Sequence, residues 1–192
     1  MFDLVILSLG FMIHLWALPY SFKNVLFDSI VGLVQLGFGF TILFYGSPAS
    51  LLPTPTGLIT GAGIGAACFV FQLLYNRGVK IKRSDLTRKF LVSQLILLLF
   101  FVPAEEVFYR GVFFNRLASI WGTTTAVLLA TSLSTMITVV SSRKPLYWLG
   151  SAVMGVLCCL GFYYSRSIWA PILIHIGNDI GFRTLNDPKS LF

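Results

Sequence analysis

The chain has 192 residues, of which 56% are hydrophobic and only 11% are charged, and its formal net charge is +7. Soluble domains carry about 25% charged residues, so this composition excludes a soluble globular protein and indicates an integral membrane protein. The basic residues lie between apolar runs, so the positive-inside rule explains the net charge and we expect no nucleic-acid partner. A single membrane domain over residues 1–192 is expected at this length.

Seven apolar runs are long enough to cross a bilayer or nearly so. They cover residues 4–20, 25–45, 57–75, 90–117, 123–140, 146–164 and 168–182. Helices satisfy their own backbone hydrogen bonds in lipid. The predicted fold class is therefore all-α, a polytopic membrane helical bundle of about seven transmembrane helices. The first run follows no basic segment and precedes no small-residue cleavage site, which predicts a retained helix.

The basic residues between the runs predict an orientation. Eleven of them fall on a single side if every run crosses once: Lys23, Arg77, Lys80, Lys82, Arg83, Arg88, Lys89, Arg143, Lys144, Arg183 and Lys189. The opposite side carries Arg116 and Arg166 only. This asymmetry predicts an outside N-terminus and a cytoplasmic C-terminus.

The third run carries Gly57, Gly61 and Gly65, spaced four residues apart. Small residues at this spacing let two membrane helices approach closely. A dinucleotide-binding loop is a poorer interpretation, because no strand or acidic partner accompanies these glycines.

The fourth run contains Glu105, Glu106 and Arg110. A charged side chain at the bilayer centre costs about 2.5–3.5 kcal/mol on insertion scales, so these groups indicate an intramembrane site. Arg110 lies four residues after Glu106, which predicts an ion pair on one helix face. Glu105 points elsewhere, and a carboxylate facing a cavity is a suitable general base. Pro103 predicts either a kink before the glutamates or a proline that helix packing tolerates.

The seventh run contains His175 and Asp179, four residues apart on one face. The carboxylate can accept from one ring nitrogen and so orient the other toward a cavity. The second histidine, His14, has no acidic neighbour in its run, and packing explains it better.

These motifs carry a resemblance. The stretch 105–110, EEVFYR, looks like the EExxxR signature of the CPBP family (CAAX protease and bacteriocin-processing), whose relatives include the type II CAAX prenyl endopeptidases. His175 and Asp179 are similar to the final HxxxN/D motif of that family. The resemblance covers about residues 90–182 as a catalytic core and leaves 1–76 as accessory N-terminal helices.

The resemblance also implies roles. Glu105 would activate the attacking water, and His175 would support it as the second catalytic residue. Glu106 and Arg110 would support the site, and Asp179 would complete it. The substrate would be a membrane peptide or a lipidated protein tail, cleaved at the lipid bilayer.

One position departs from the family pattern. The histidine of the middle FxxxH motif falls on Thr138, a supporting residue that can hydrogen-bond a water or an oxyanion but is a poor metal ligand. A hydroxyl bonded back to a helix carbonyl is the structural alternative. The family chemistry is described as glutamate-type or metal-dependent. A divalent metal such as zinc would have Glu105 and His175 as its ligands, a poorer set than two histidines and a carboxylate.

Three functions remain open. The first is an intramembrane endopeptidase, and the second is a weakened or inactive family member that acts as a membrane binding or bacteriocin-immunity-type protein. The third is a small proton-coupled transporter that uses Glu105, Glu106 and His175 as a relay. The lack of an evident internal repeat disfavours the transporter. A multi-pass protein of a prokaryotic plasma membrane is expected.

Overall fold

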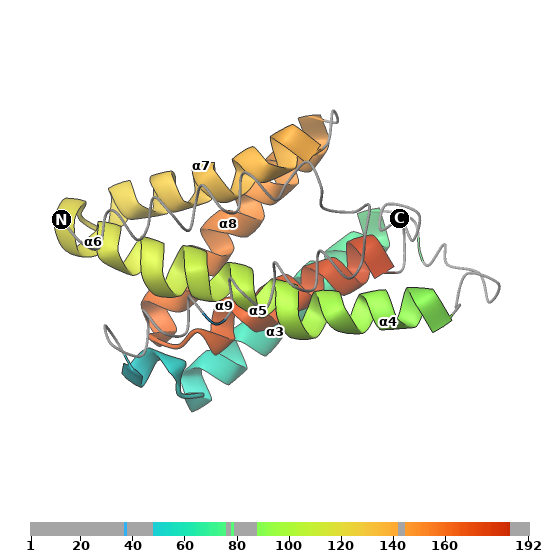
Figure 1. Ribbon diagram of the computed structural model, residues 1–192, viewed down its shortest axis with the longest axis horizontal. Helices are drawn as coiled ribbons and strands as arrows, with labels where there is room; N and C mark the ends of the chain where they lie inside the picture. Colours follow the sequence, from blue (N-terminus) through green and yellow to red (C-terminus); the bar gives the residue numbers. More distant parts are fainter. Residues whose placement is uncertain (1–36, 38–47, 76–77, 79–87, 142–144, 185–192) are drawn as a thin grey trace.

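The computed structural model describes residues 37, 48–75, 78, 88–141 and 145–184, and this part of the chain is helical without a strand (Figure 1). The all-α prediction is therefore confirmed. The first two predicted spans, 4–20 and 25–45, lie outside the described residues, so the count of seven stays a prediction. Each of the other five predicted spans corresponds to a helical segment.

The described residues form a succession of helical segments. In chain order they are the 3₁₀ helix η1 (Pro48–Leu51), α3 (Pro55–Tyr75), α4 (Arg88–Ile96), the π segment η3 (Leu97–Phe101), α5 (Val102–Glu106), the π segment η4 (Val107–Phe114), α6 (Asn115–Trp121), α7 (Thr123–Ser141), α8 (Pro145–Ser165), α9 (Trp169–Asp179) and the π segment η5 (Ile180–Thr184).

The segments α4 to α6 form one continuous helix, which crosses Figure 1 as a single long rod. The first π segment ends two residues before Pro103. Proline offers no N–H to the preceding turn, and a wider π turn is a known way to absorb that loss. Gly122 ends the long helix with φ 82° and ψ 163°, a positive-φ conformation that glycine adopts without strain.

The surface of these helices is apolar. Three of them are long and apolar enough to cross a membrane: Pro55–Tyr75, Phe90–Trp121 and Pro145–Ser165. Large hydrophobic side chains are exposed on several helices, among them Ile59, Leu74, Leu99, Leu128 and Leu149. An exposed apolar surface of this kind suits contact with lipid, and the chain is an integral membrane protein.

Two helix pairs form the frame of the described bundle. α7 and α8 pack against each other antiparallel, whereas α3 and α9 run parallel and side by side (Figure 1). Gly57, Gly61 and Gly65 are all buried in the contact with the α9 region. A Cβ at Gly61 would lie only 2.9 Å from the Cα of Ala170, so the predicted close helix approach is confirmed.

A short turn between α8 and α9 fixes where α9 begins. Ser167 donates through Oγ to the carbonyl of Leu52 over 3.0 Å, and Trp169 donates through Nε1 to the carbonyl of Leu51 over 3.0 Å. The turn is thus bonded to the segment that precedes α3. These contacts set the start of α9, the helix that carries His175.

Candidate intramembrane active site

The centre of the site is Glu106, the last residue of α5, whose side chain is fully buried. Arg110 donates through Nη1 to Glu106 Oε1 over 3.1 Å, so the ion pair expected from the four-residue spacing forms. Arg110 lies in the π segment η4 and is itself only 3% exposed. Its Nη2 also reaches the carbonyl of Gly155 at 3.4 Å, which connects this pair to α8.

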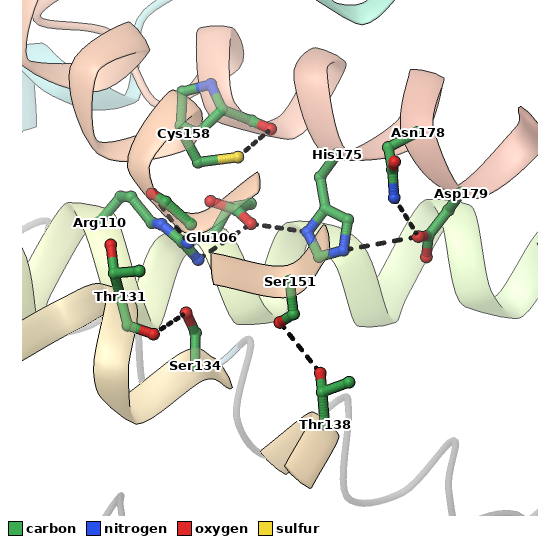
Figure 2. A network of polar contacts seen from close by, with 12 residues as sticks. Glu106, Arg110, Thr131, Ser134, Thr138, Ser151, Cys158, His175, Asn178 and Asp179 are labelled. Carbon is green, nitrogen blue, oxygen red and sulfur yellow. Dashed lines mark hydrogen bonds and ion pairs between the residues drawn. The ribbon is translucent and has the colours of Figure 1, made fainter. Parts of the chain in front are cut away.

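The same carboxylate oxygen holds the imidazole of α9. His175 Nδ1 lies 2.6 Å from Glu106 Oε1 (Figure 2). An ionised carboxylate only accepts hydrogen bonds, so Nδ1 carries the proton and donates it. The other carboxylate oxygen, Oε2, is buried without a hydrogen-bond partner in the described part of the chain.

The second ring nitrogen faces Asp179. His175 Nε2 lies 3.8 Å from Asp179 Oδ1, which is beyond hydrogen-bond distance. Asn178 donates through Nδ2 to that same oxygen over 3.3 Å, and Gln72 of α3 donates to Asn178 Oδ1 over 2.8 Å. Nε2 therefore makes no hydrogen bond to Asp179, although the two side chains lie on one helix face as the sequence predicts.

Glu105 is half-buried. Within the described residues its carboxylate makes no hydrogen bond or ion pair, yet it contributes to the negative potential at the imidazole together with Glu106 and Asp179. The structure thus brings Glu106, Arg110, His175 and Asp179 into one cluster with Glu105 at its edge. A role for Glu105 as the base stays a prediction.

Thr138 lies apart from this cluster. Its Oγ1 donates to Ser151 Oγ of α8 over 3.0 Å, and Figure 2 shows the two side chains as a separate pair. One turn further along α8, Gly155 faces Thr131 and Ser134 of α7. α7 therefore presents hydroxyl groups, and no imidazole, to the side of α8 that bears the Arg110 contact.

The residues of the site do not suit a metal ion. No group of three or more His, Cys, Asp or Glu among the described residues is arranged to hold one. The carboxylate nearest to His175 is occupied by the guanidinium of Arg110, which places a positive charge where a cation would bind. The residues expected as ligands, Glu105 and His175, are too few for a protein zinc site.

Sequence reasoning missed three parts of this arrangement. The resemblance implies that the glutamates and His175 share one site, but Glu106 and His175 are 69 positions apart, so spacing did not predict the bond between these two residues. The sequence did not predict Gln72 and Asn178 as residues of the site, although a polar side chain near the end of an apolar helix can indicate a polar contact between helices. The close contact at Gly177 was not predicted either, and a Cβ there would collide with the backbone of Gly65.

A buried ion-paired carboxylate and an imidazole inside an apolar helical bundle define a membrane protein with an intramembrane polar site. Residues 87–181 match the family described as type II CAAX prenyl endopeptidase Rce1-like. This part of the chain belongs to that family, which confirms the resemblance read from the two motifs. No curated protein and no solved structure matches the chain. The matched segment contains both motifs and leaves α3 outside it.

Proposed function

We propose that the protein is an intramembrane endopeptidase that hydrolyses a peptide bond at the membrane, in a catalytic core that corresponds to about residues 90–182. The observation that carries this proposal is the hydrogen bond of 2.6 Å between His175 Nδ1 and the buried carboxylate of Glu106. It joins the two motifs that identify the family across two different helices.

In the proposed reaction the two glutamates divide the work. Glu106 is occupied by Arg110 and His175 and fixes the imidazole, so that Nε2 presents its lone pair to the attacking water. Glu105 takes a proton from that water as the general base. The hydroxide adds to the scissile carbonyl carbon, and the proton held by Glu105 passes to the leaving amine as the C–N bond breaks.

The substrate we propose is a membrane peptide or a lipidated protein tail. The apolar surroundings of the cluster favour a chain that is already held at the bilayer. We further propose an outside N-terminus in a prokaryotic plasma membrane. The parallel arrangement of α3 and α9 supports single crossings, because the three passes between them (the long helix, α7 and α8) return the chain to the same direction.

The test uses purified protein in nanodiscs and an internally quenched peptide that ends in a farnesylated CAAX sequence, with the unprenylated peptide as a comparison. Wild-type protein is expected to cleave the peptide, and Glu105→Gln to reduce turnover by about 10²–10⁴, the contribution typical of a general base. Arg116→Gln is the matched control, because it removes an exposed charge from the same long helix. Full turnover in Glu105→Gln would refute the assigned base.

A second candidate is a family member that binds such peptides without cleaving them. The observation that favours it is the Thr138–Ser151 pair, because the middle-motif position supplies only a hydroxyl. Peptide that binds wild-type and Glu105→Gln protein with equal affinity, and is recovered intact from both, would select this candidate and exclude the peptidase.

A further inference from the structure

One side of α7 carries four hydroxyl groups over two helical turns. They are spaced three or four residues apart and therefore share a helix face: Thr131, Ser134, Thr135 and Thr138. On α8, Ser151 accepts a hydrogen bond from Thr138 over 3.0 Å. One turn further, a Cβ at Gly155 would lie 3.2 Å from both Thr131 Oγ1 and Ser134 Oγ. We call this contact between α7 and α8 the hydroxyl seam.

Two hydroxyls of the seam lack the partner that a helix can provide. A serine or threonine in a helix can bond back to a carbonyl one turn earlier. Ser134 does so, donating to the carbonyl of Thr131 over 3.0 Å. Thr131 and Thr135 do not, because Oγ1 of each is buried without a hydrogen-bond partner in the described part of the chain. Thr131 is itself only 7% exposed, so both hydroxyl groups require a partner from outside α7.

The Thr131 end of the seam meets the buried ion pair. Arg110 Nη2 reaches the carbonyl of Gly155 at 3.4 Å, and Figure 2 shows Thr131 beside Arg110. Cys159, one turn along α8 from Gly155, lies close to both Arg110 and Thr131. Two atoms of the ion pair, Arg110 Nε and Glu106 Oε2, are also buried without a hydrogen-bond partner among the described residues.

These four atoms have the hydrogen-bonding properties that suit water. The guanidinium nitrogen only donates, the carboxylate oxygen only accepts, and each hydroxyl does both. Water can accept from the first, donate to the second and exchange hydrogen bonds with the hydroxyls, and a buried water makes about three such bonds. Arg110 disfavours a cation here and Glu106 disfavours an anion, so the charges also favour a neutral ligand.

We propose that Thr131 and Thr135 hold bound water against the buried ion pair, and that this water serves the hydrolysis. Glu106 Oε1 holds His175, so water bonded to Oε2 of the same carboxylate lies next to the imidazole. The second half of the proposal rests on the proposed peptidase function, whereas the water site itself does not.

The test is radiolytic labelling of the protein in nanodiscs by a short X-ray pulse, which converts bound water into hydroxyl radicals that oxidise nearby sulfur atoms. Cys158 and Cys159 are both fully buried, but Cys158 donates to the carbonyl of Pro171 on α9. We expect tandem mass spectrometry to find Cys159 oxidised about tenfold faster than Cys158. Equal rates at the two cysteines would overturn the water site.

The double variant Thr131→Val, Thr135→Val keeps the shape of both side chains and removes both hydroxyls. It is expected to lower the oxidation of Cys159 severalfold and to leave that of Cys158 unchanged, since unfolding would raise both. The matched control is Thr125→Val, which removes an exposed hydroxyl from α7 and should change neither rate. An unchanged rate at Cys159 in the double variant would show that the threonines do not hold the water.

Stability and cleavage distinguish the water site from the proposed function. A hydroxyl that holds water loses a hydrogen bond in Thr131→Val, so the equilibrium constant for unfolding should rise about fivefold, whereas replacing an unpaired hydroxyl would lower it and overturn the site. In the cleavage assay, kcat of the double variant should fall about fivefold or more. Unchanged kcat would remove the water's part in hydrolysis. Rapid oxidation of Cys159 in a wild-type protein that cleaves nothing would uphold the water site and exclude the peptidase.

Discussion

Replacing Arg110 by methionine tests the centre of the site. The pair with Glu106 spans 3.1 Å, and the two side chains are 4% and 0% exposed. At an effective dielectric constant of about 20, two unit charges at this distance attract by about 5 kcal/mol. Losing one partner of a buried pair destabilises proteins by about 3–5 kcal/mol. Because His175 still contacts Glu106, we expect Arg110→Met to lower the free energy of unfolding by about 3 kcal/mol.

The measurement is reversible unfolding in mixed micelles by added dodecyl sulfate, followed by circular dichroism. Arg116→Met is the matched control, because it removes an exposed arginine from the same helix and is expected to change stability by less than about 0.5 kcal/mol. Adding Glu106→Gln to Arg110→Met removes the unpaired charge and should restore about 1–2 kcal/mol. Equal stabilities for the two arginine variants would refute the argument, since they would mean that the carboxylate is well hydrated.

Two further predictions concern helix packing and the middle motif. Gly65→Ala places a Cβ 2.5 Å from the carbonyl oxygen of Leu173 and should destabilise the protein by about 1–3 kcal/mol, whereas Gly63→Ala meets no atom within 4 Å and should be neutral or slightly stabilising in the same unfolding assay. Equal effects would contradict the close packing of α3 on α9. Thr138→His supplies the missing imidazole and should raise peptide cleavage about 10²-fold, the value of one well-placed donor. The exposed position Ser132 gives the matched Ser132→His control, and unchanged cleavage in both would place Thr138 outside the site.

The parts of the site that sequence predicted are those that lie within one helical turn. Glu106 and Arg110 are four residues apart and form their ion pair. His175 and Asp179 have the same spacing but stand 3.8 Å apart, and Asn178 donates a hydrogen bond to the same carboxylate oxygen. Helical periodicity determines which side chains share a face, but it does not determine which side chains they contact on other helices.

The contacts between helices could not be predicted from helical periodicity, for the same reason. The bond between Glu106 and His175 depends on how α9 is placed, and that placement follows from the turn bonded to Leu51 and from the glycine contact with α3. The π segments around Pro103 were not predicted either. The predicted options there were a kink or a tolerated proline, and a wider turn in a continuous helix is a third solution.

The adjacent glutamates gain a physical explanation from this arrangement. Successive residues of a helix point about 100° apart, so one position cannot both bind the arginine and face a substrate. Glu106 Oε1 already contacts both Arg110 and His175, so this carboxylate connects α5, η4 and α9. Glu105 is half-buried and contributes to the negative potential at the same imidazole, and it makes no hydrogen bond or ion pair within the described residues. In the proposed peptidase one carboxylate holds the histidine and another moves a proton, so both residues are required. Exchanging their roles would lose the hydrogen bond between Glu106 and His175 that links the long helix to α9.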